Sequence, residues 1–187
     1  MTVQTSSAER GSNSWSIAPV VPRTKDGTLV TDVRRVIVGV DDDEAGLTAL
    51  AAATQFARGH RAPLVAVRAW ALGLPRHGGR RMRHLRHPHV VLSFSGTEQC
   101  AEAAMLARRA FRSAVGAVPA DIPVTIETPD DDPALALTAM AGLPGDVLVV
   151  GDGAGHHFRR LAHGSVSRYC ERKARCPVVV VRAERMS

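Results

Sequence analysis

A glycine-dense segment near the end of the chain, Gly151–Ser165, has the residue types of an anion-binding loop. A largely apolar run, Asp146–Val150, precedes it and predicts a buried parallel strand. The residues after Ser165 have apolar positions at helical spacing and predict a helix. Closely spaced glycines let backbone N–H groups approach a ligand, and a helix N-terminus adds unpaired N–H donors. The segment therefore favours phosphate binding, although the same glycines would also serve an ordinary strand-to-helix turn.

Two familiar phosphate loops fit this segment poorly. A Walker loop needs a lysine directly after its last glycine, whereas Gly164 is followed by Ser165. A dinucleotide fingerprint follows the first strand of its domain, and this loop comes late in the chain. The segment is therefore neither of these two loops.

The segment resembles the C-terminal pattern of the universal stress protein family. That pattern has a glycine, two residues, a second glycine, nine residues and then Gly-Ser or Gly-Thr, followed by a helix and a Pro-Val-Val-Val strand. Gly151, Gly164, Ser165 and the strand entry Cys176–Val178 match it in register. Ala154 occupies the position of the second glycine, with Gly153 and Gly155 on either side of it. The resemblance extends over roughly residues 34–183.

The resemblance implies a domain that binds an adenine nucleotide, ATP with or without Mg²⁺, at the Gly151–Ser165 loop. The acid directly after the first strand, Asp41, would contact the adenosine, and the backbone of Ala69 would lie against the adenine. On this resemblance, the residues assigned to nucleotide binding are Val40, Asp41, Ala69, Gly151, Gly153, Ala154, Gly155, Gly164, Ser165, Val166 and Ser167.

The two residues after Asp41 depart from the family, which often has small residues there. Here they are Asp42 and Asp43. Their negative charges oppose a triphosphate unless a divalent ion or basic side chains lie between them. The arginines of residues 71–96 are one possible source of that positive charge.

Strand-like and helix-like segments alternate along the chain. The predicted strands are Arg35–Val40, Pro63–Trp70, Ile122–Glu127, Asp146–Val150 and Val178–Arg182. This order predicts an α/β fold: a three-layer, open, twisted parallel sheet of five strands with helices on both faces. It is Rossmann-like and, by the resemblance, adenine-nucleotide α-hydrolase-like. The resemblance also makes the first and fourth strands neighbours, so that Asp41 and the glycine loop line one cleft.

Two of the helices between these strands carry start signals. Thr97 is a predicted N-cap for a helix over Glu98–Val118, whose apolar face includes Met105. The acids Asp130–Asp132 precede Pro133, which predicts a helix that begins at the proline. These acids are interpreted as helix caps, not as a catalytic pair.

Composition predicts a flexible N-terminal extension, residues 1–33, and one domain, residues 34–187. Within the domain, residues 71–96 form an arginine- and histidine-rich loop. A solvated loop is the favoured interpretation. The alternatives are a phosphate or nucleic-acid contact and a metal site built from His84, His87 and His89.

The chain of 187 residues is 45% hydrophobic and 22% charged, as in soluble globular proteins. No apolar run has the length of a membrane span or the form of a signal peptide. Three cysteines, Cys100, Cys170 and Cys176, do not form a disulfide framework, which predicts reduced thiols and a cytoplasmic protein. The net charge of +6 raises the question of nucleic-acid binding, which ranks last because the basic residues lack an aromatic platform.

No catalytic arrangement is visible in the sequence, so no catalytic residue and no metal ligand is assigned. We expect nucleotide binding without efficient turnover, with slow ATP hydrolysis at most. The alternative hypothesis is a dimeric interaction protein that binds no nucleotide. In either case the apolar edge strand Val178–Arg182 predicts a homodimer, because such an edge pairs readily with a copy of itself.

Overall fold

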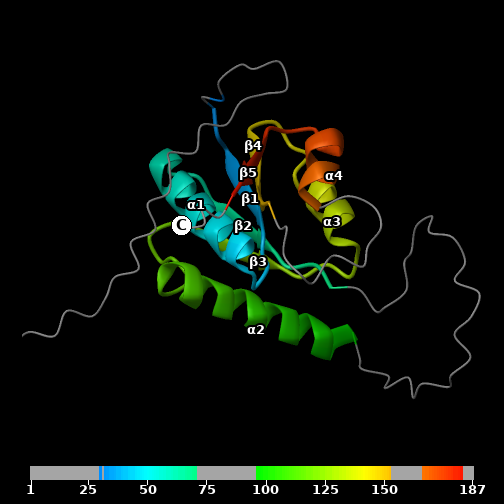
Figure 1. Cartoon of the computed structure of the whole chain (residues 1–187). Helices are drawn as coiled ribbons and strands as arrows, with labels where there is room; N and C mark the ends of the chain where they lie inside the picture. Colours follow the sequence, from blue (N-terminus) through cyan, green and yellow to red (C-terminus); the bar gives the residue numbers. More distant parts are fainter. Residues whose placement is uncertain (1–29, 31, 71–95, 153–165, 183–187) are drawn as a thin grey trace, which may run out of the picture.

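The structure is a computed structural model, and it describes residues 30, 32–70, 96–152 and 166–182. Figure 1 shows the helices and strands in chain order. The elements are β1 (Arg35–Gly39), α1 (Glu44–His60), β2 (Leu64–Val67), α2 (Gly96–Val115), β3 (Val124–Glu127), α3 (Pro133–Met140), β4 (Asp146–Gly151), α4 (Val166–Lys173) and β5 (Val178–Val181).

The five strands form one parallel sheet in the order β3-β2-β1-β4-β5. The chain runs outward from β1 to β3 in one direction, and then continues from β4 to β5 in the other. The direction therefore changes between β1 and β4, where Val36 pairs with Val147 and Val38 with Val149. This order confirms the predicted fold class and the predicted contact between the first and fourth strands.

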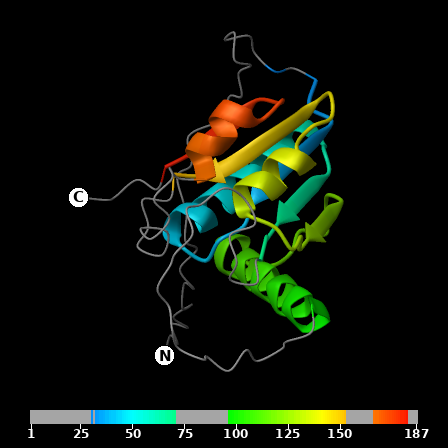
Figure 2. The ribbon, with the colours of Figure 1, turned by 90° about the vertical axis from the view of Figure 1, so that its right-hand side faces the viewer.

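Helices cover both faces of the sheet. Val36 and Val38 belong to a core cluster with residues of α1 and α2, which includes Phe111. The intervening Ile37 belongs to a second cluster with residues of α3 and α4, among them Leu137. Figure 2 shows α3 and α4 lying in front of the sheet. The central strands are buried on both sides, which explains why their sequences are continuous apolar runs rather than alternating ones.

Local signals explain where two helices begin. The side chain of Asp43 accepts a hydrogen bond of 2.7 Å from the N–H of Gly46 and caps α1. Asp132 caps α3 by accepting from the N–H groups of Ala134 and Leu135, and Pro133 is the first helical residue. Asp132 confirms that a helix cap lies among the acids before Pro133, and Asp43 caps α1 in the same way.

The sequence prediction for α2 was wrong in two respects. The helix runs from Gly96 to Val115 rather than from Glu98 to Val118, so Thr97 lies inside it and is not its N-cap. Met105 is 63% exposed, whereas the buried positions are Ala103, Ala107, Ala110 and Phe111. Small alanines let α2 pack closely against α1, and this close packing decides which face is buried.

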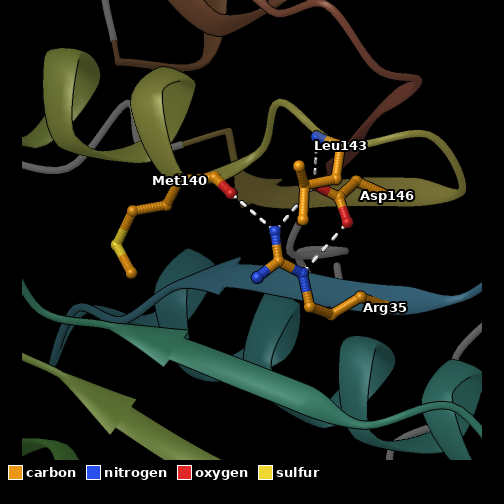
Figure 3. Close-up of polar contacts among 4 residues, drawn as sticks. All are labelled: Arg35, Met140, Leu143 and Asp146. Carbon is orange, nitrogen blue, oxygen red and sulfur yellow. Dashed lines mark hydrogen bonds and ion pairs between the residues drawn. The ribbon is translucent and has the colours of Figure 1, made fainter.

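A buried ion pair joins β1 and β4 at their amino ends (Figure 3). Arg35 donates to both carboxylate oxygens of Asp146, from Nε at 3.0 Å and from Nη2 at 2.9 Å. Nη2 also donates to the backbone oxygen of Met140, and the N–H of Leu143 donates to Asp146. The Asp146 side chain is 1% exposed, so this network ties both central strands to the turn that follows α3.

Candidate functional site

The candidate site lies at the carboxyl ends of β1 and β4. Because these strands are parallel neighbours, the segments that leave them emerge side by side. β1 leads into the turn Val40–Asp43, and β4 ends at Gly151. The first turn of α1 begins at the same edge of the sheet, and Val40 is buried beneath it in the core shared with that helix.

Asp41 is half-buried, and its carboxylate accepts a 2.8 Å hydrogen bond from the N–H of Asp42. Burial raises the pKa of Asp41, and the charges of Asp43 and Asp42 raise the same pKa further. The hydrogen bond from Asp42 and the positive charge of Arg68 act in the opposite direction. Burial and the neighbouring acids therefore disfavour the ionised form of Asp41 in the folded protein.

The turn around Asp41 is tight. A Cβ on Gly46 would lie 2.8 Å from the backbone oxygen of Asp41 and 3.0 Å from the Oδ1 of Asp43. No side chain fits at Gly46, so the acid turn packs directly on the first turn of α1. Because Asp43 is engaged as a helix cap, Asp41 and Asp42 are the two acids of this turn whose side chains do not cap the helix.

Asp42 forms an ion pair with Arg68, whose Nη2 donates to Oδ2 at 2.9 Å. Arg68 follows the last residue of β2, and its own N–H donates to the backbone oxygen of Glu127. Sequence reasoning missed this arginine, because it sought positive charge in residues 71–96, most of which lie outside the described residues. The available signal was position: a side chain just after β2 lies at the same sheet edge as one just after β1.

Ala69 and Trp70 continue from Arg68 along this edge. Ala69 is half-buried. Trp70 pairs with Asp130 in an isolated bridge, and its indole N–H donates to the backbone oxygen of Thr128 at 2.9 Å. These contacts join the segment after β2 to the segment after β3.

Gly151 ends β4 directly against α1. It pairs with Val181 of β5, and a Cβ at this glycine would clash with the backbone of Ala45. The next residue, Asp152, pairs with Arg182 through an ion pair of 3.1 Å. The end of β4 is therefore held between α1 and β5.

A cavity of about 410 Å³ opens beside the first turn of α4. It is lined by Asp152, Ser167, Arg168, Glu171, Val180 and Arg182. Ser167 is buried and Val166 is half-buried, so the start of α4 lies against the sheet. The lining is polar and contains both signs of charge.

Of the residues predicted to bind nucleotide, the structure describes Val40, Asp41, Ala69, Gly151, Val166 and Ser167, all at the carboxyl edge of the sheet. Gly153, Ala154, Gly155, Gly164 and Ser165 lie outside the described residues. The same holds for the histidines of the arginine- and histidine-rich loop, and for nearly all of the N-terminal extension. Within the described ranges, no group of three histidine, cysteine, aspartate or glutamate side chains is arranged to hold a metal ion.

The part of the chain that forms the sheet and the candidate site also matches a known protein family. The sequence pattern that defines the universal stress protein family matches residues 32–182. The chain belongs to the universal stress protein family. The match confirms the resemblance seen at the Gly151–Ser165 loop and includes the whole sheet. Among curated proteins, none matches the sequence closely enough to count as a relative.

Solved structures of universal stress proteins share this fold. The UspA protein from Lactobacillus plantarum is 22% identical with a TM-score of 0.54, over 81% of this chain and 99% of that one. A universal stress protein solved in complex with cAMP is 22% identical with a TM-score of 0.50, over 82% of this chain and 100% of that one. A family protein from Burkholderia pseudomallei is 20% identical with a TM-score of 0.50, over 82% and 98% of the two chains.

Among the helices in the described part of the chain, none combines the length and apolar character that a membrane crossing requires.

Proposed function

We propose that this universal stress protein domain binds an adenine nucleotide, ATP, at the carboxyl ends of β1 and β4. The observation that carries the proposal is the position of Asp41 and Gly151: Gly151 ends β4, Asp41 lies in the turn after the neighbouring parallel strand β1, and both lie against the first turn of α1. Ligands of open α/β sheets bind where the strand order reverses, and these strands flank that point. One solved structure with this fold is a complex with the adenine nucleotide cAMP, which supports the ligand class.

Different residues of the site would contact different parts of the nucleotide. Asp41 would accept hydrogen bonds from the ribose hydroxyls, and the backbone of Ala69 would lie against the adenine. The glycines of the loop, with Ser165 and the start of α4, would donate to the phosphates. Mg²⁺ would reduce the repulsion between the phosphates and the acids of the β1 turn. We expect binding with slow hydrolysis at most, in a regulatory role.

The experiment is a titration of Mg·ATP into the purified protein, followed by calorimetry and by thermal unfolding. Saturation at a hundred times the dissociation constant should stabilise the protein by roughly 2.7 kcal/mol. Asp41→Ala should weaken binding. Asp121→Asn is the matched control, because Asp121 is an exposed acid paired with Arg58 at the far end of α1. Absence of both heat and stabilisation at millimolar ATP would refute the proposal.

A second candidate is the dimeric interaction protein without a nucleotide. The observation that favours a dimer is the place of β5 at the edge of the sheet, with Val178, Val179 and Val180 only partly buried. An apolar edge strand pairs readily with a second copy of itself. We propose this strand, Val178 to Arg182, as the homodimer interface.

Native mass spectrometry of the freshly purified protein distinguishes the two candidates. The mass gives the oligomeric state, and any added mass identifies a retained nucleotide. Val180→Lys should shift a dimer toward monomer, because it puts a charge on the edge. A protein that is dimeric and carries no nucleotide would favour the second candidate. We also propose a cytoplasmic location, because three cysteines without a paired pattern are typical of reduced thiols.

A further inference from the structure

We propose that Arg68 is a specificity-determining residue of this site: its guanidinium neutralises the acid turn after β1 and so allows an anionic nucleotide to bind. The inference rests on the proposed function and deepens it. It explains how a site with Asp42 and Asp43 at positions often occupied by small residues would still accept phosphates.

Backbone pairing places Arg68 at the carboxyl edge of the sheet, where the β1 turn lies. Gly39 of β1 pairs with Val67, and the N–H of Val40 donates to the oxygen of Val67. Arg68 is the next residue, and the one after it is Ala69, assigned to the adenine. Arg68 therefore lies level with the β1 turn, between two segments of the proposed site.

The side-chain contacts leave part of the guanidinium unused. Nη2 donates to Asp42 at 2.9 Å, whereas Nη1 is buried and has no hydrogen-bond partner among the described residues. Only 17% of the Arg68 side chain is exposed, against 47% for Asp42. Because the charge is largely shielded from solvent, counterions screen it less than they screen a surface arginine.

The charges around the turn explain why this pairing matters. Three consecutive carboxylates, Asp41 to Asp43, would give the site beside the β1 turn a negative potential that repels phosphates. The charge of Arg68 acts on Asp41 as well as on Asp42, since it lowers the pKa of Asp41 against the dominant effect of burial. One arginine thus moderates two of the three acids.

Arg68 has an alternative, purely structural role, which is to hold the end of β2 to the β1 turn. The two roles differ for charged and uncharged ligands. A charge effect changes the affinity for ATP and leaves that for adenosine nearly unaltered. A structural effect lowers the affinity for both ligands to the same extent.

The test is calorimetric titration of Mg·ATP and, separately, of adenosine into the full chain. The variants are Arg68→Gln, Asp42→Asn and the double variant. Arg58→Gln is the matched control, because it removes the same charge from an ion pair with Asp121 at the opposite end of α1. Arg68→Gln should weaken the binding of ATP by about fivefold and the binding of adenosine by less than about twofold. The double variant should recover near wild-type affinity for ATP, because the acid that needed compensation is gone.

Asp42→Asn alone should bind ATP more tightly than wild type, because the charge of Arg68 is then no longer offset by Asp42, and this keeps the inference testable if Arg68→Gln does not fold. Equal losses for ATP and adenosine would overturn the inference in favour of the structural role. Equal affinities in all variants would overturn it while the nucleotide function stands. If wild type and Asp42→Asn bind neither ligand, the proposed function fails, and this inference fails with it.

Discussion

Gly151 and Ala45 approach so closely that the space for a side chain between them is filled: a Cβ on Gly151 would lie 2.6 Å from the backbone oxygen of Ala45. The atoms nearest to this Cβ are backbone atoms of Ala45 and Gly46, and they cannot turn away as a flexible side chain would. The glycine that begins the family's loop pattern is therefore required by the packing of β4 on α1, whether or not a ligand binds.

Gly151→Ala should destabilise the protein by about 1–3 kcal/mol, because the new methyl group forces β4 and α1 apart. The measurement is urea unfolding without nucleotide. Gly59→Ala is the control: a Cβ at Gly59 meets nothing within 4 Å, and alanine there should stabilise α1 by about 0.5–1 kcal/mol. A Gly151→Ala protein as stable as wild type would contradict this packing argument.

Asp146→Ala should destabilise the protein by about 3–5 kcal/mol, because it leaves the partly buried guanidinium of Arg35 without its carboxylate partner. The same change also removes the acceptor for the N–H of Leu143. Denaturant unfolding measures the effect. The control, Asp121→Asn, breaks an exposed ion pair with Arg58 and should change stability little. Equal effects of the two substitutions would show that burial of the pair contributes nothing.

Asp41→Asn should make the ligand-free protein more stable at neutral pH. Burial raises the pKa of Asp41 in the folded protein, so its ionised form is penalised there relative to the unfolded chain. As pH rises from the unfolded pKa, about 3.9, through the raised folded pKa, wild type loses stability that Asn retains. The advantage of Asp41→Asn should therefore vanish in acid. Unfolding at a series of pH values measures it, and an advantage independent of pH would contradict the assignment.

The three cysteines should react with a thiol reagent in a fixed order. Cys100 is exposed, whereas Cys170 and Cys176 are buried, and burial raises the pKa of Cys170 to about 12. A thiol with so high a pKa is almost wholly protonated at neutral pH and is a poor nucleophile. Mass spectrometry after brief alkylation should find one label on the native protein, and none on Cys100→Ser. Rapid labelling of Cys170 in the folded state would contradict the described packing of α4.

The sequence alone determined the elements and much of the fold. Short runs of β-branched apolar residues such as Val36–Val38 favour strands buried on both faces, which predicts a parallel sheet with helices on each side. Asp132 and Pro133 predicted the start of α3, because capping and proline preferences are local chemistry. The glycine spacing from Gly151 to Ser165 predicted the family, which the match over residues 32–182 confirmed.

Tertiary structure decided the features that depend on contacts between distant segments. The buried face of α2 could not be predicted from its own period, since Met105 and Ala107 both suit an apolar face and only packing against α1 selects Ala107. The pairing of Arg68 with Asp42 joins residues from two different strand ends, so no local pattern predicts it. The need for glycine at position 151 likewise comes from Ala45, far away in the chain. Local preferences depend on residues that are neighbours in the sequence, whereas contacts across the sheet form only once the strands have paired.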